Sequence, residues 1–179
     1  MPVNENAAAS PVRSAGPPVV ADGDPGGQTL IVLDPAGLGK HDEVPATWRP
    51  FTDQRQILWC RIPAEGALSA AEELLGDADD DSALVVDIVA SGPVAEEALR
   101  LAARHPPAVR AVMLVDPAWE PDHLARLAKL DEAGVEVRVI AHSRGGELDR
   151  VPPPLPLGHP DVVAAVYRTI GELRPTKRS

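Results

Sequence analysis

The sequence has few aromatic residues and few basic ones. Only 3% of its 179 residues are aromatic, and 27 acidic residues outnumber 17 basic ones, which leaves a formal net charge of -10. A chain with so few aromatic side chains has few platforms on which bases could stack, and its negative charge repels a phosphate backbone. These two shortages argue against a nucleic-acid partner.

Cysteine and long apolar runs are also scarce. The single cysteine, Cys60, cannot form an internal disulfide, and we expect it to be a packing residue in a strand. No apolar run approaches the roughly 20 residues that a membrane span requires, and the first residues lack the basic-then-apolar order of a signal peptide. The five histidines show no pair at the one-turn spacing of zinc proteases. The sequence therefore predicts a cytoplasmic protein with no membrane contact, no metal and no cofactor.

What the chain does contain is a strand–helix–strand pattern over residues 82–117. An apolar run at 83–90 is followed by a Gly-Pro break, an amphipathic stretch and a second apolar run at 111–115. A helical crossover makes the two strands parallel. Further apolar runs alternate with helical patterns, so the sequence predicts an α/β fold, a three-layer α/β/α sandwich with a five-stranded, mainly parallel sheet. The other three expected strands are 29–33, 56–62 and 135–141.

The domain organisation follows from composition. Residues 1–28 are rich in Ala, Pro, Gly and Ser without apolar periodicity, which predicts a disordered N-terminal tail. Residues 29–174 are expected to form one α/β domain, and residues 175–179 a basic C-terminal end. The run 135–141 alternates apolar and polar residues, which is typical of an edge strand. Pairing of such an edge between two chains would give a homodimer, although Glu136 and Arg138 are residues that blunt edges.

Chemistry-bearing residues follow several of the expected strands. Asp34, Ser91 and Asp116 each come at the end of an apolar run, as do Arg61 and the pair His142-Ser143. In an open parallel sheet, the loops at the carboxyl ends of the strands form the ligand site. We therefore expect these residues to gather at one rim, with His159 returning to the same rim at the end of a proline-rich stretch.

Three segments together resemble the α/β-hydrolase fold family. They are TLIVLDPAG (29–37), VVDIVASGPVAEEALRLAARHPPAVRAVMLVDP (85–117) and LPLGHPDVVAAVYRTIGEL (155–173). The resemblance implies a catalytic role for His159. It also aligns residues 34–37 with the position at which the family has a His-Gly pair before its oxyanion loop. The family's nucleophile elbow, GxSxG, falls on Gly92 in this sequence, where no hydroxyl is available, and Ser91 stands one residue early.

A second elbow pattern lies further along the chain. VRVIAHSRGG (137–146) places Ser143 at the centre of AxSxG after an expected strand. His159 would act as the base and Asp149 would orient it, because this chemistry needs serine, imidazole and carboxylate within hydrogen-bond reach of one another. However, the prolines at 152–154 leave no room for the helix that should follow an elbow. Asp149 is also the acid in the register that the family resemblance implies.

Two functions remain open from these residues, with a weaker third. The first is hydrolysis or transfer of a small-molecule ester or thioester acyl group, with His159 as base and Ser91 or Ser143 as nucleophile. The second is a catalytically lapsed protein of the same fold, a pseudoenzyme that binds a small molecule or a partner protein. In either case the binding residues would be Asp34, Gly37, Gly92 and Asp116. The third is a flavodoxin-like binding domain with strand order 2-1-3-4-5.

Overall fold

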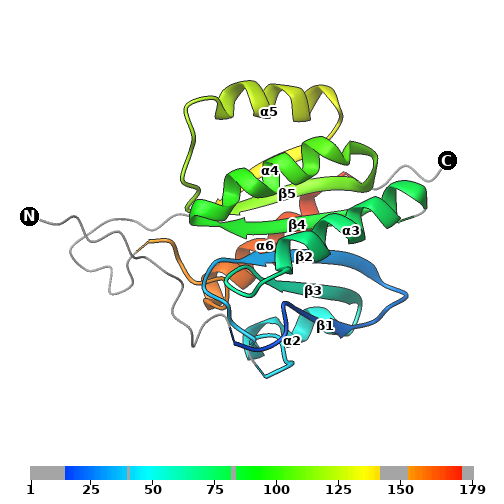
Figure 1. Cartoon of the computed structure of the whole chain (residues 1–179), viewed down its shortest axis with the longest axis vertical. Coiled ribbons are helices and arrows are strands. Elements are labelled where there is room, and N and C mark those ends of the chain that lie inside the picture. The colour runs from blue at the N-terminus through cyan, green and yellow to red at the C-terminus, as the bar shows by residue number, and fades with distance from the viewer. Residues whose placement is uncertain (1–14, 40, 82–83, 142–152, 175–179) are drawn as a thin grey trace, which may run out of the picture.

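A computed structural model describes residues 15–39, 41–81, 84–141 and 153–174. Within these residues the chain forms a six-stranded sheet in the order β1-β3-β2-β4-β5-β6 (Figure 1). β1 runs antiparallel to β3, and the other neighbours are parallel. The strands are β1 (Val19–Gly23), β2 (Gln28–Asp34), β3 (Arg55–Arg61), β4 (Val86–Ser91), β5 (Val109–Val115) and β6 (Glu136–Ala141).

Helices cover both faces of this sheet. In Figure 1, α3 and α4 lie in front of the strands and α6 lies behind them, which confirms the predicted three-layer α/β/α arrangement. The helices are η1 (Ala46–Trp48), α2 (Arg49–Thr52), α3 (Ala67–Asp80), η2 (Gly92–Val94), α4 (Ala95–Arg104), η3 (Pro106–Ala108), α5 (His123–Glu132) and α6 (Pro160–Glu172). No helix in the described part of the chain is both long enough and apolar enough to cross a bilayer.

The strand order creates a switch point between β2 and β4. The chain passes from β2 to β3 on one side, and α3 then carries it back across to β4 on the other side. Ligand sites of open α/β sheets form outside the carboxyl ends of strands at such a point. The five parallel strands alone share their order with flavodoxin-like sheets. The antiparallel β1 outside β3 is an additional strand beyond those five.

β1 corrects the predicted tail. The prediction of disorder through residue 28 is wrong for residues 19–23, and the predicted count of five strands is one short. Val20 of β1 is buried in the core. Arg61 holds the preceding residues, since its backbone N–H donates to the Pro18 carbonyl and its guanidinium donates to the carbonyls of Pro17 and Ala15, each at 2.8 Å. Arg61 lies some forty residues further along the chain, so the local composition of the first residues does not reveal these contacts.

The boundaries of α3 also differ from the expectation. The sequence predicts a helix that starts at Ser69, with Glu72 completing a capping box, and stops at Gly76. In the structure Gly66 is the N-cap, and the helix continues through Gly76 to Asp80. Ala71, Leu75 and Ala78 are buried on one face of α3, and this packing outweighs the roughly 1 kcal/mol that an interior glycine costs relative to alanine.

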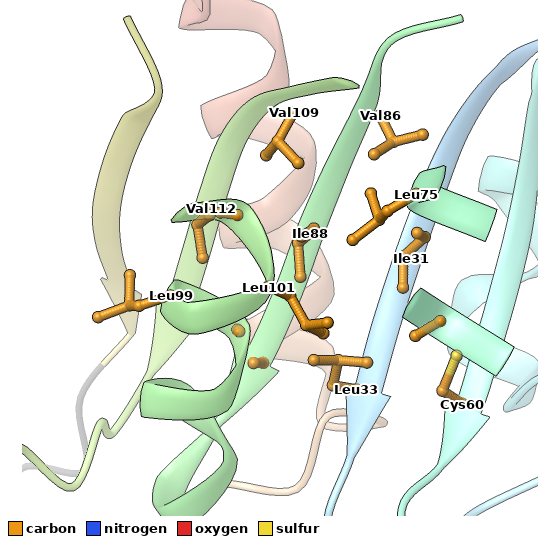
Figure 2. Packing of buried hydrophobic residues seen from close by; sticks show 14 of the residues in the cluster. Ile31, Leu33, Cys60, Leu75, Val86, Ile88, Leu99, Leu101, Val109 and Val112 are labelled. Carbon is orange, nitrogen blue, oxygen red and sulfur yellow. The ribbon is translucent and has the colours of Figure 1, made fainter. Parts of the chain in front are cut away.

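Two apolar clusters make the core because strand side chains alternate between faces. Figure 2 shows the first cluster, in which strand residues such as Ile31 and Ile88 meet Leu75 of α3 and Leu99 and Leu101 of α4. The second cluster lies on the α6 face and contains three of the five aromatic residues. Its members include Trp48, Phe51, Trp59, Met113, Leu157 and Val166. Cys60 is fully buried in the first cluster, and burial raises the pKa of its thiol to about 12.

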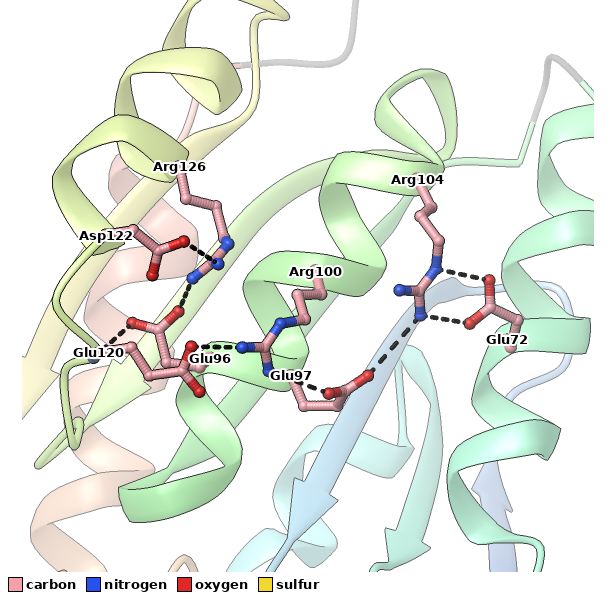
Figure 3. Close-up of polar contacts among 8 residues, drawn as sticks. All are labelled: Glu72, Glu96, Glu97, Arg100, Arg104, Glu120, Asp122 and Arg126. Carbon is pink, nitrogen blue, oxygen red and sulfur yellow. Dashed lines mark hydrogen bonds and ion pairs between the residues drawn. The ribbon is translucent and has the colours of Figure 1, made fainter.

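Ion pairs join the three helices α3, α4 and α5 (Figure 3). Arg104 of α4 donates to Glu72 of α3 at 2.6 Å, and Arg126 of α5 pairs with the buried Glu96 of α4. The Glu96 carboxylate also accepts the Glu120 backbone N–H at 3.1 Å. Within α5 only Leu130 is buried. Polar contacts therefore contribute much of what fixes α5 on the sheet.

His105, which follows α4, lies between two carboxylates of α3. Its Nε2 is 2.8 Å from Glu72 Oε1, and its Nδ1 contacts Asp79. Burial alone would lower the pKa of His105, but the hydrogen bonds and charges of Asp79 and Glu72 outweigh burial and leave that pKa raised. A group with a raised folded pKa stabilises the fold fully below its unfolded pKa, and this stabilisation is lost as pH rises through the folded pKa.

We therefore expect a pH-dependent effect of His105→Gln on stability. The loss of unfolding free energy relative to wild type should be larger at about pH 5.5 than at about pH 9, because only the imidazolium gains from both carboxylates. Urea unfolding at the two pH values measures this. Arg104→Gln is the matched control, since a guanidinium stays charged throughout this range. An equal loss of unfolding free energy for His105→Gln at both pH values would contradict the raised pKa of His105.

Candidate functional site

The carboxyl ends of β2, β4 and β5 bring four of the expected residues to one rim. Asp34 ends β2, Ser91 ends β4 with Gly92 next in the chain, and Asp116 follows β5. The Ala118 backbone N–H donates to the Gly92 carbonyl at 3.0 Å, which ties the segment after β5 to the turn after β4. These positions surround the switch point of the sheet.

The turn after β4 has the geometry of an elbow. Ser91 is extended, with φ -134° and ψ 154°, and Gly92 then takes φ +53° as the chain enters η2 and α4. A sharp strand-to-helix turn is where the family presents its nucleophile. The residue at the tip is Gly92, which has no side chain. Ser91 lies within the strand and is only 1% exposed.

A proline covers the elbow. A Cβ built on Gly92 would lie 2.8 Å from Cγ and 3.2 Å from Cβ of Pro154. Real Cβ atoms essentially never approach another heavy atom as closely as 2.8 Å. The volume that a nucleophile side chain would need at this turn is therefore filled by Pro154.

Residues 153–159, which we call the rim segment, are fixed at several points. The Leu155 N–H donates to Asp116 Oδ2 at 2.8 Å. Further along, the Trp48 indole N–H donates to the Leu157 carbonyl at 2.7 Å, and the Thr47 hydroxyl donates to the Gly158 carbonyl at 2.8 Å. The rim segment thus runs from the ends of β4 and β5 to the η1 region across the switch point.

Three positions whose amides could bind an oxyanion either lack an N–H or have it engaged. The family uses the N–H of the residue after the nucleophile, which is Pro93 here and has no N–H. The second donor would come from the loop after β2. In that loop the N–H groups of Ala36 and Leu38 donate to the carboxylate of Asp34 at 2.8 Å and 2.6 Å.

Asp34 and Gly37 belong to a buried network. The Trp59 indole N–H donates to Asp34 Oδ2 at 3.1 Å, and Arg61 Nε donates to the Gly37 carbonyl at 3.1 Å. Burial raises the pKa of Asp34, while the hydrogen bonds from Ala36, Leu38 and Trp59 and the charge of Arg61 act in the opposite direction. Asp34 and Arg61 are both fully buried. The network fixes the loop after β2 and the segment that precedes β1.

His159 is the N-cap of α6. Its Nδ1 accepts the Asp161 backbone N–H at 3.1 Å, so this ring nitrogen satisfies a helix terminus. Pro160 stands in the first turn of α6, as the sequence predicts. The other two proposed members of the second elbow, Ser143 and Asp149, lie outside the described residues.

Two other features bear on ligand binding. Within the described residues, no group of three or more His, Cys, Asp or Glu side chains could hold a metal ion. A wide, open hollow lies over β1 and α2 and shares no residue with the rim. Four of its nine lining residues are acidic, namely Asp22, Asp42, Glu43 and Asp53, and one, Arg49, is basic.

Comparisons with known proteins add a fold-level similarity. No protein-family model and no curated protein matches this sequence. A solved structure of a dienelactone hydrolase from Anabaena variabilis is similar over 86% of this chain and 91% of that chain, with 15% sequence identity and a TM-score of 0.45. A similarity of this extent says nothing about chemistry, so the site has to be judged on its own geometry.

Pro93 and Pro154 both affect whether the elbow could support catalysis, but only the effect of Pro93 can be predicted from the sequence. Pro93 directly follows the elbow position, so the missing amide is readable once Gly92 is placed there. Pro154 is one of three consecutive prolines at 152–154, and the sequence shows only that no helix can form there. Its place over Gly92 depends on the path of the rim segment across the sheet.

We expect Gly92→Ala to destabilise the protein by about 2 kcal/mol or more, since it combines a left-handed backbone with a steric overlap on Pro154. Gly134→Ala is the matched control: Gly134 has φ +82° and no atom within 4 Å of a built Cβ, so only backbone strain is expected there. Thermal and urea unfolding measure both.

Adding Pro154→Ala to Gly92→Ala should restore the part of the loss that comes from the overlap. An effect of Gly92→Ala no larger than that of Gly134→Ala, with no rescue by Pro154→Ala, would show that Pro154 does not rest on the elbow.

Proposed function

We propose that this protein is a catalytically lapsed α/β-hydrolase-fold protein that acts by binding a partner protein. The observation that carries the proposal is the elbow itself: Gly92 occupies its tip at φ +53°, and Pro154 fills the space above it. An elbow that keeps its strained backbone without a nucleophile retains the scaffold of the fold and lacks the reactive group.

The other requirements of acyl transfer support the same conclusion. The reaction needs a nucleophile, a base and preorganised donors for the oxyanion. Pro93 offers no N–H, and the amides of Ala36 and Leu38 are bound by the carboxylate of Asp34. Nδ1 of His159 accepts a hydrogen bond from the first turn of α6. The amides of Ala36 and Leu38 and Nδ1 of His159 thus each have a hydrogen-bond partner within the chain.

A protein partner fits the rim better than a small molecule does. Small-molecule sites are concave and bury most of the ligand. The rim segment occupies the space over the elbow, where a small molecule would have to lie. In the segment after β5, which Ala118 ties to Gly92, Trp119 is 39% exposed, and Leu124 at the start of α5 is 70% exposed. Exposed tryptophan is typical of residues that dominate protein interfaces.

The absence of catalysis is tested with a fluorophosphonate probe and a panel of small esters and thioesters. We expect no labelling and no turnover for the wild type. We expect the same for Gly92→Ser, because this change supplies a hydroxyl but neither an oxyanion donor nor space beneath Pro154. Labelling of the wild type that disappears in Ser143→Ala or Ser91→Ala would contradict the proposal and establish serine chemistry at that residue.

The binding part is tested by crosslinking and affinity capture with the full chain in extracts of its source. A partner should be retained by the wild type and lost by Trp119→Ala combined with Leu124→Ser. Tyr167→Ser is the matched control, since Tyr167 is also 70% exposed but lies on α6 on the opposite face of the sheet. Capture that is equal for all three proteins would remove the region around Trp119 as the binding surface.

A further inference from the structure

The two edges of the sheet differ in how well they are protected. β1, at one edge, has five residues, follows Pro17 and Pro18, and ends at Gly23 with φ +98°. Short length, proline and glycine are devices that prevent an edge from pairing with another chain. β6, at the other edge, has six residues and contains neither proline nor glycine. Within the described residues, the outer side of β6 has no strand partner.

The two charged residues of β6, Glu136 and Arg138, form an ion pair with each other, and Arg138 also pairs with Glu172 of α6. Nε of Arg138 donates to Glu136 Oε1 at 2.6 Å, and its Nη1 donates to Glu172 of α6 at 2.8 Å. A single unpaired charge on an edge repels an approaching strand, whereas a balanced pair of opposite charges two residues apart can complement a second copy of itself. Val139, the next residue, is 37% exposed on this strand.

We propose that two copies of this chain associate through β6 in an antiparallel, two-fold symmetric pair that joins their sheets into one. The proposal goes beyond the function proposed above and does not depend on it, because a joined sheet edge is compatible with an active or a lapsed site.

The charge pattern selects the register of this pair. A two-fold axis perpendicular to the sheet leaves each side chain on the same face of the sheet. Residues that lie opposite each other in an antiparallel pair also share a face, so the axis must pass beside one residue and cannot fall between two successive residues. With the axis at Val137, each Glu136 lies opposite the Arg138 of the second copy. With the axis at Glu136 or at Arg138, like charges lie opposite each other, which is unfavourable. Only the register centred on Val137 therefore matches both charged positions.

The apolar residues agree with the same register. Val137 then lies opposite its own copy, and the half-exposed Val139 lies opposite Val135, which is buried beside the end of α5. Cross-strand pairs of β-branched residues stabilise antiparallel sheets. The first four residues of β6, from 136 to 139, together with Val135 just before the strand, thus form a self-complementary edge, which is the requirement for an isologous dimer.

Charge reversal tests this register. Glu136→Arg makes positions 136 and 138 both positive, and Arg138→Glu makes both negative, so each variant alone places like charges opposite each other across the axis. We expect the wild type to sediment as a dimer and each variant to show at least about a tenfold larger dissociation constant. A 1:1 mixture of the two variants should form a heterodimer, because every facing pair is then of opposite charge.

The 1:1 mixture distinguishes a role of Glu136 and Arg138 between two chains from a role within one chain. Mixing the variants restores contacts between chains, but it cannot repair a defect inside either chain. Circular dichroism and thermal unfolding establish that each variant is folded. If either variant is unfolded, Val139→Lys replaces it, a change at an exposed position that should also favour monomers. Glu73→Lys on the exposed face of α3 is the matched control and should remain dimeric. A monomeric wild type at about 100 µM, or a mixture that stays monomeric, would overturn the proposal.

Discussion

The contact between Pro154 and Gly92 is the constraint on which the rest of this account depends. The sheet places the elbow at the switch point, where an α/β fold of this kind forms its site. The chain itself then occupies that point, with Pro154 against the elbow and Leu155 bonded to Asp116. A left-handed Gly92 and a proline above it are mutually compatible, because glycine alone leaves space for the ring at this backbone conformation.

Around this contact, several of the polar residues at the strand ends form hydrogen bonds within the chain. The carboxylate of Asp34 organises its own loop, Arg61 links that loop to the segment before β1, and His159 caps α6. Such roles stabilise the fold without chemistry, and they illustrate why a fold does not determine a function. The turn after β4 has the backbone of an elbow, Gly92 at its tip carries no hydroxyl, and Asp34 and His159 form hydrogen bonds within the chain.

The sequence predicts much of the layered architecture, because the relevant signals are local. The apolar runs that became β4 and β5, the helix between them and the proline at the start of α6 all follow from periodicity and turn chemistry. The missing hydroxyl at Gly92 is likewise readable. β1 could not be found in this way, since its stability comes from pairing with β3 and from Arg61. The extension of α3 past Gly76 and the position of Pro154 also depend on tertiary packing, which outweighs local propensity.

The most direct measurement of a closed rim is hydrogen exchange, observed by NMR, at the Leu155 amide and the Trp48 indole N–H. Both groups donate hydrogen bonds that hold the rim segment, to Asp116 Oδ2 and to the Leu157 carbonyl. The account predicts that both protons exchange slowly, as groups that open only with a larger part of the structure do. Exchange of the Leu155 amide at the rate of an unstructured peptide would show an open rim and contradict it.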